Sequence, residues 1–186
     1  LYGYLIGRDY NPEMLPELVN AYERFKQSDN RNSLAAPDVP FQMLTSLKLD
    51  KRHWIGIAEN ASWQMTRMNL NTFLRHGVFD KSKMVRMIAK RLSDPALIAK
   101  ARVLPYQLMT AYTCASKDLP NKIRHALQDA MEIALANVPA VDGKVYVFPD
   151  VSGSMHSPVT GYRQGATTAV RCIDVAALVS AAMLRT

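Results

Sequence analysis

The chain has 186 residues, enough for one or two domains with a hydrophobic core, and apolar residues make up 48% of it, which argues against intrinsic disorder. No apolar run approaches the roughly 18 residues that a membrane-spanning helix needs. The opening residues LYGYLIGRDYNP include neither the basic start nor the long apolar stretch of a signal peptide. They also lack an initial Met, so we expect an internal fragment of a cytoplasmic protein. Cys114 and Cys172 form no CxxC motif, which favours two reduced thiols over a disulfide.

Positive charge is concentrated in one part of the sequence. The net charge is +7, and residues 67–102 contain nine Lys and Arg against only Asp80 and Asp94, so the remainder is neutral overall. A local surplus of this size indicates a polyanionic partner, of which nucleic acid is the commonest. A solvated basic face with no partner is the alternative, and charge alone does not decide between them.

Capping and turn residues predict helices through most of the chain. The pair Asn11-Pro12 opens the first, and Asp50, Asp80 and the pair Asp94-Pro95 are expected to cap later ones. Gly77 is placed to end a helix in the left-handed conformation. Helices are expected over residues 11–25, 50–57, 63–76, 105–116 and 120–137. Three more are expected to begin near residue 41, after residue 80 and, as a short helix, after residue 94. Short connections between successive helices predict a mainly α fold, as an α-solenoid or an irregular bundle.

Two of these helices carry the candidate nucleic-acid contacts. On helix 63–76 the apolar residues fall on one arc (Trp63, Leu70, Phe73 and Leu74), and a polar flank runs beside it (Arg67, Asn71 and Arg75, followed by His76). On the helix after Asp80, cations face away from the expected buried stripe of Met84, Val85, Ile88 and Leu92; these cations are Lys83, Arg86 and Lys90. A cationic stripe without neighbouring carboxylates repels itself slightly, and the phosphates of a nucleic acid would supply the missing charge.

The pattern changes after residue 138. Residues 139–143 interrupt the helical periodicity, and the apolar run 144–148 predicts a buried strand of a parallel sheet. The Ala-rich segment 167–184 predicts a helix that packs on such a sheet. Strand, loop and helix are the opening of an α/β domain, so the sequence predicts a helical-repeat domain over 1–142 and an incomplete α/β domain over 143–186.

The loop after the predicted strand gathers three oxygen ligands. Asp150, Ser152 and Ser154 alternate at the carboxyl end of the strand, where ligands bind in open α/β sheets. One carboxylate and two hydroxyls suit Mg²⁺. A nucleophilic serine is disfavoured because the chain lacks a G-x-S-x-G elbow, and the histidines lack the spacing of a zinc site. We therefore expect a protein with no catalytic residues.

Four stretches of the chain resemble the Ro autoantigen family in order and content. They are VPFQMLTSLKLDKRHW, SWQMTRMNLNTFLRHGVF, ARVLPYQLMTAYTCA and IRHALQDAMEIALANVPAVDGKVYVFPDVSGSM, and the resemblance is specific from about Val39 to Met155. The loop with Asp150, Ser152 and Ser154 resembles the metal-ion-dependent adhesion site (MIDAS) of von Willebrand factor A domains. In the Ro family a TROVE module precedes such a domain.

The resemblance implies a fold and a function. A TROVE module is a ring of HEAT-like helical repeats, and Ro proteins bind small non-coding Y RNAs and the ends of misfolded RNAs. They act as ribonucleoprotein scaffolds in RNA quality control, and bacterial relatives tether the exoribonuclease polynucleotide phosphorylase through a Y RNA. The implied metal site is incomplete in this chain, because the family's later Thr and Asp ligands have no counterpart among its residues. The alternative function is a protein-interaction module that acts through the metal.

Overall fold

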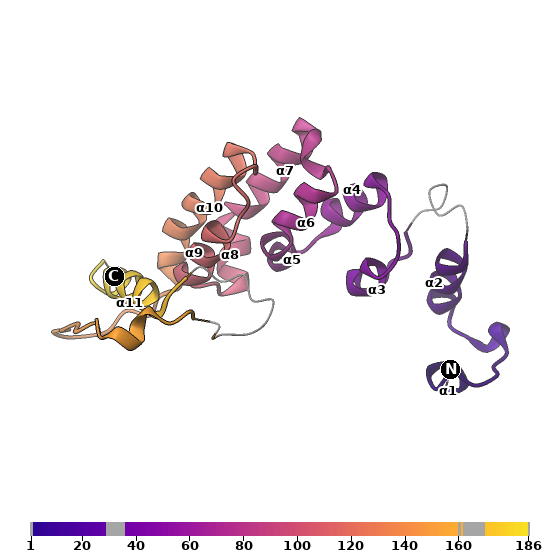
Figure 1. Cartoon of the computed structure of the whole chain (residues 1–186), viewed down its shortest axis with the longest axis horizontal. Coiled ribbons are helices and arrows are strands. Elements are labelled where there is room, and N and C mark those ends of the chain that lie inside the picture. Colours follow the sequence, from indigo (N-terminus) through magenta and orange to yellow (C-terminus); the bar gives the residue numbers. More distant parts are fainter. Residues whose placement is uncertain (1, 29–35, 160, 162–169, 186) are drawn as a thin grey trace. The chain divides into compact units, whose positions relative to one another are not determined.

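The structure is a computed structural model, and it describes residues 2–28, 36–159, 161 and 170–185. These residues are mainly helical, as the sequence predicts, and they contain no strand; their one β-type contact is an isolated bridge between Pro158 and Arg171. The chain divides into two compact units, residues 1–60 and residues 61–186 (Figure 1). The predicted domain boundary at residue 142 lies within the second unit, and it stays a prediction.

The first unit consists of short helices. They are α1 (Tyr2–Leu5), the 3-10 turn η1 (Pro12–Met14), α2 (Glu17–Gln27), α3 (Phe41–Thr45) and α4 (Lys51–Asn60). The prediction of one helix from Asn11 to about residue 25 was wrong, because Asn11 caps only η1. Leu15 is extended, as a residue before proline prefers, and α2 begins after Pro16. Asp50 caps α4 as predicted, since its Oδ1 accepts a hydrogen bond from the His53 backbone N–H at 3.0 Å.

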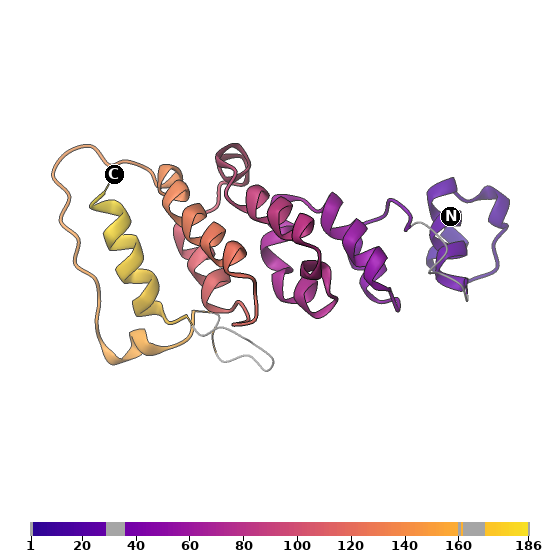
Figure 2. The ribbon, with the colours of Figure 1, turned by 90° about the horizontal axis from the view of Figure 1, so that it is seen from above.

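The second unit contains the larger core. Its elements are α5 (Trp63–Met68), α6 (Leu70–Arg75), η3 (Val78–Asp80), α7 (Ser82–Leu92), α8 (Pro95–Ala101), α9 (Pro105–Thr113), α10 (Asn121–Ala134), η4 (Leu135–Asn137), η5 (Gly153–His156) and α11 (Cys172–Met183). Helix α10 packs against α7, α8 and α9, and these helices lie side by side in Figures 1 and 2. Ile88, Ile123 and Leu127 are completely buried in this core.

Some predicted helix termini in the second unit are correct and others are wrong, and local backbone chemistry explains both. Gly77 is left-handed, with φ 69°, and Asp94 caps α8 through the Leu97 backbone N–H, both as predicted. The single predicted helix 63–76 is broken at Asn69, whose φ of −113° and ψ of 16° are not helical. The Asn69 side chain bonds the Met65 carbonyl oxygen and so competes with the helix. Asp80 lies in η3 and is not the cap of α7, which begins at Ser82.

The predicted buried strand at 144–148 was wrong. This segment is extended but forms no ladder with any described residue, and the side chains of Tyr146 and Phe148 are 75% and 87% exposed. A strand is stabilised by the hydrogen bonds of a neighbouring strand, and the described residues provide none here. The α/β arrangement is therefore not seen among the residues after 142 that the structure describes.

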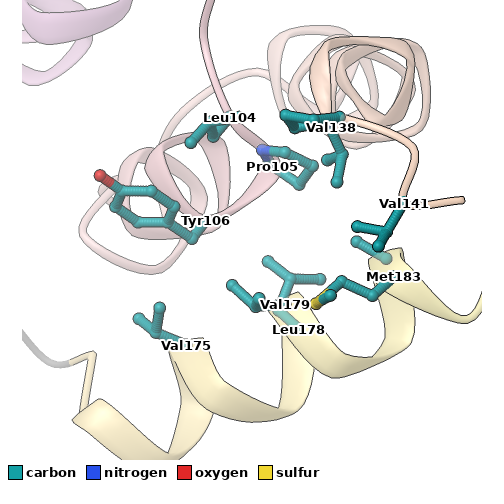
Figure 3. Close-up of a pocket in the computed structure, with 11 residues that line it drawn as sticks. Leu104, Pro105, Tyr106, Val138, Val141, Val175, Leu178, Val179 and Met183 are labelled. Carbon is teal, nitrogen blue, oxygen red and sulfur yellow. The ribbon is translucent and has the colours of Figure 1, made fainter. Parts of the chain in front are cut away.

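Helix α11 packs on another helix and not on a sheet. Cys172–Met183 is helical as expected, but Val170 and Arg171 of the predicted helix are not helical, and its residues 167–169 lie outside the described residues. Figure 3 shows apolar side chains of α11 facing α9 and the segment after α10 across a cavity of about 360 Å³. Ala182 is the one side chain of α11 that is fully buried among the described residues, so α11 adds little to the core.

Candidate functional site

The cationic face of α7, formed by Lys83, Arg86 and Lys90, is exposed along its whole length. On the opposite side of the helix, Met84 and Ile88 are no more than 1% exposed and join the core. The sequence-predicted separation of a charged face from a buried face is therefore present, with Val85 half-buried at its edge.

None of the three cations is neutralised by a described residue. No carboxylate of the described part of the chain forms an ion pair with Lys83, Arg86 or Lys90. With a rise of about 1.5 Å per residue, the three side chains span roughly 10 Å of helix axis. The arrangement can therefore attract several phosphates of one nucleic-acid strand at once.

Two hydrogen bonds fix α7 against α5 and so orient the cationic face. The Trp63 indole N–H donates to the Leu92 carbonyl oxygen at 3.1 Å, and both residues are buried. Arg91 donates from Nη1 to the hydroxyl of Thr66 at 3.1 Å, and burial lowers the pKa of Arg91. Arg91 thus serves the packing of α7, although it belongs to the basic stretch of the sequence.

The polar flank of α5 and α6 differs from the α7 face, because two of its side chains form hydrogen bonds to other parts of the fold. Arg67 donates from Nη1 to the Gln107 carbonyl oxygen at 3.0 Å, and burial lowers its pKa. Asn71 donates to the Cys114 carbonyl oxygen at 2.9 Å and accepts from the Ser116 backbone N–H at 2.8 Å. Both side chains therefore connect α5 and α6 to α9 and to the turn after it.

The end of this flank contains one free cation and one weakly basic ring. Arg75 is exposed at the end of α6 and forms no ion pair with a described residue. Burial, and then the charge of Arg75, lowers the pKa of His76. The neutral imidazole is therefore favoured at His76, and its contact with a nucleic acid stays a prediction.

The loop predicted to bind metal is compact and exposed. The Asp150 carboxylate accepts a hydrogen bond from the Ser152 backbone N–H at 2.8 Å, and the hydroxyls of Ser152 and Ser154 lie 3.0 Å apart. The backbone and side chain of Ser152 lower the pKa of Asp150, which keeps the carboxylate ionised. The structure therefore brings the three predicted ligands together, and they are the hard oxygen donors that suit Mg²⁺.

Other ligand chemistry is not supported in the part of the chain that the structure describes. No three His, Cys, Asp or Glu side chains gather there in a way that would hold a metal ion. His156 follows the loop and contacts Arg171, which forms an exposed ion pair with Asp174 at 2.9 Å. These three residues form a hydrogen-bonded link between the loop and the start of α11.

Comparison of the chain with protein-family models, curated proteins and solved structures finds no match. Among the described helices, none is long and apolar enough to cross a membrane.

Proposed function

We propose that the chain is part of a non-catalytic RNA-binding scaffold of the Ro type. Its partners would be Y RNA and misfolded RNA, with an exoribonuclease held through the RNA. The observation that carries the proposal is the cationic face of α7, which is exposed and lacks carboxylate partners among the described residues. The opposite side of the helix is buried in the core and fixes the orientation of this face. The resemblance of the sequence to Ro proteins supports the choice of RNA as the polyanion.

The face favours recognition of the RNA backbone and not of bases. Its members are long, flexible cations, and no aromatic residue occurs in α7 to stack on an unpaired base. Phosphate contacts position an RNA without reading its sequence. A scaffold that accepts many misfolded RNAs requires this tolerance.

The test is replacement of Lys83, Arg86 and Lys90 together by Gln. Gln has nearly the same helix propensity as Lys and Arg, so the unfolding free energy should change little. The affinity for every RNA should fall, and the log–log dependence of affinity on salt should flatten by roughly two to three, at about 0.7–0.9 for each lost contact. Filter binding at several salt concentrations measures both quantities, and an unchanged slope would contradict the proposal.

A second candidate function rests on the gathering of Asp150, Ser152 and Ser154 in one loop. A bound Mg²⁺ there would supply a positive centre that a carboxylate of a partner protein completes. RNA binding that survives EDTA favours the scaffold, whereas partner binding that EDTA abolishes favours the metal-dependent interaction module.

A further inference from the structure

Residues 144–150 form an extended segment whose two faces differ in exposure. Val145 and Val147 are half-buried, whereas Tyr146 and Phe148, which alternate with them, are largely exposed. This alternation is the pattern of a strand that has one face on the protein and the other in solvent. In Figure 2 the segment lies along the outside of the second unit, between α10 and η5. A further strand could therefore reach it from solvent.

The backbone of the segment lacks a partner within the described part of the chain. No described residue forms a hydrogen bond with a backbone N–H or C=O group of residues 144–150. An exposed extended segment with apolar side chains is a site where a second chain can add as a strand. Such a strand would satisfy the backbone and also cover part of Tyr146 and Phe148.

The charges at the two ends of the segment favour a second copy of this chain as the added strand. Lys144 lies as far before Val147 as Asp150 lies after it, and neither end forms an ion pair with a described residue. If two copies pair antiparallel with Val147 opposite itself, each Lys144 faces an Asp150 of the other copy. Opposite charges in these positions stabilise a strand pair, whereas a parallel pair in register would set like charges against each other.

Pro149 is compatible with the same register. Facing residues of an antiparallel pair alternate between hydrogen-bonded and non-hydrogen-bonded positions. If Val147 occupies a non-hydrogen-bonded position, then Pro149, two residues later, occupies one as well. The N–H that proline lacks would point away from the other copy, so no hydrogen bond between the strands is lost. The register also sets Tyr146 opposite Phe148 of the other copy, and aromatic cross-strand pairs are stabilising.

We infer that residues 144–150 are a dimer interface, at which two copies of this chain pair antiparallel about Val147. The interface is a two-stranded pair between molecules and differs from the buried parallel strand that the sequence predicted. It depends neither on RNA nor on a bound metal, so its failure would leave the proposed function standing.

A single cysteine tests the register, in a C114S/C172S background that removes both native thiols. In the proposed pair the two copies of residue 147 face each other with Cα atoms about 4.5 Å apart, a distance that a disulfide bridges. V147C should therefore give a disulfide-linked dimer on mild oxidation, seen by non-reducing electrophoresis. V145C is the matched control, because the two copies of residue 145 would be about 14 Å apart, beyond the reach of a disulfide. Absence of the V147C dimer, or equal dimer from V145C, overturns the inference.

Charge reversal tests the pairing of Lys144 with Asp150. Sedimentation equilibrium in EDTA measures the dimer affinity without a contribution from metal, and circular dichroism checks the helical content of each variant. K144E sets like charges opposite each other at both ends and should weaken the dimer by about tenfold, whereas K144E/D150K should restore the affinity. K122E makes the same change of net charge at an exposed position of α10 and should leave the affinity unchanged.

Three results of the charge experiment count against the interface. The first is an unmodified chain that stays monomeric at about 100 μM, where even a complex with a dissociation constant of tens of micromolar would form. The second is equal weakening by K144E and K122E, which would show an effect of net charge alone. The third is failure of K144E/D150K to restore the affinity, since the two ends would then not face each other.

Discussion

At the scale of single residues, Asn71 uses both ends of its exposed carboxamide in hydrogen bonds to the protein's own backbone. Its NH₂ group donates to the Cys114 carbonyl oxygen, and its oxygen accepts from the Ser116 backbone N–H. These bonds occupy the oxygen and one of the two N–H groups of the carboxamide, and both partners belong to the turn after α9. The residue is therefore better described as a link between α6 and the α9–α10 turn.

Replacement of Asn71 by Ala should lower the unfolding free energy by about 1–2 kcal/mol, because two exposed hydrogen bonds of modest net value are lost. Urea denaturation measures this change, and Arg75→Ala, one helical turn away and without an ion pair to a described residue, is the matched control that should change stability little. The salt slope of RNA binding should stay the same in Asn71→Ala. A flattened slope with unchanged stability would show that Asn71 contacts RNA directly.

The role of Asn71 could not be predicted from the sequence. Its two partners are 43 and 45 residues away, and helical periodicity reports only which residues share a face of one helix. Arg67 shows the same limit, since its partner Gln107 is 40 residues away. The α7 face was easier to predict because burial of Met84 and Ile88 alone determines which side of the helix is exposed.

Asp150 provides the one carboxylate of the predicted metal loop. Asp150→Ala should abolish Mg²⁺ binding to the chain, because two neutral hydroxyls alone do not offset the dehydration of the ion. The helical content should be retained, since Asp150 is exposed and far from the buried core in sequence. Titration calorimetry with Mg²⁺ measures the affinity, and Asp142→Ala, which removes an exposed carboxylate from the segment before the loop, is the control. Equal Mg²⁺ affinity in Asp150→Ala and the unmodified chain would refute the assignment.

At the scale of elements, signals carried by neighbouring residues predicted the caps of α4 and α8 correctly, whereas the predicted cap at Asp80 was wrong. Asp50 and Asp94 cap α4 and α8 because a short side chain reaches an N–H group three residues later, which is a purely local geometry. The break at Asn69 was missed because Asn is tolerated within helices, and only the side-chain bond to Met65 shows that it ends α5. Long helices with one buried side are predictable from their periodicity. Interruptions within them depend on side chains that compete for the hydrogen bonds of the helix backbone, and the sequence does not show which side chains do so.

The segment 144–148 shows where local pattern is insufficient. Alternating Val and aromatic residues fit a strand, but a strand exists only when another segment pairs with it, and no described residue does so. The nearby helix α11 is apolar apart from Asp174 and Ser180, and it buries only Ala182 within the described part of the chain. Helices of this kind are normally covered on more than one side, so the packing of α11 on α9, on η5 and on the segment after α10 satisfies only part of its apolar surface.

At the scale of the whole molecule, the buried side chains of the second unit are concentrated in its helical core. Among the described residues after 142, only Val170 and Ala182 are buried apolar residues, whereas the buried residues of α5–α10 lie between Trp63 and Ala134. The exposed ion pair between Arg185 and Glu132, at 3.0 Å, adds little more to the attachment of α11. The core of α5–α10 should therefore be stable without α11.

Shortening the chain to residues 1–142 should consequently preserve most of its helicity and a cooperative unfolding transition. The unfolding free energy should fall modestly, because the apolar contacts of α11 with α9 are lost while the core around Ile88 and Leu127 remains. A peptide of residues 143–186 should be unfolded, since one helix of 12 residues without a packing partner is marginal in water. Circular dichroism with urea denaturation tests both pieces. A folded, protease-resistant 143–186 peptide, or loss of cooperativity in 1–142, would show that α11 belongs to the same folding unit as the helices before it.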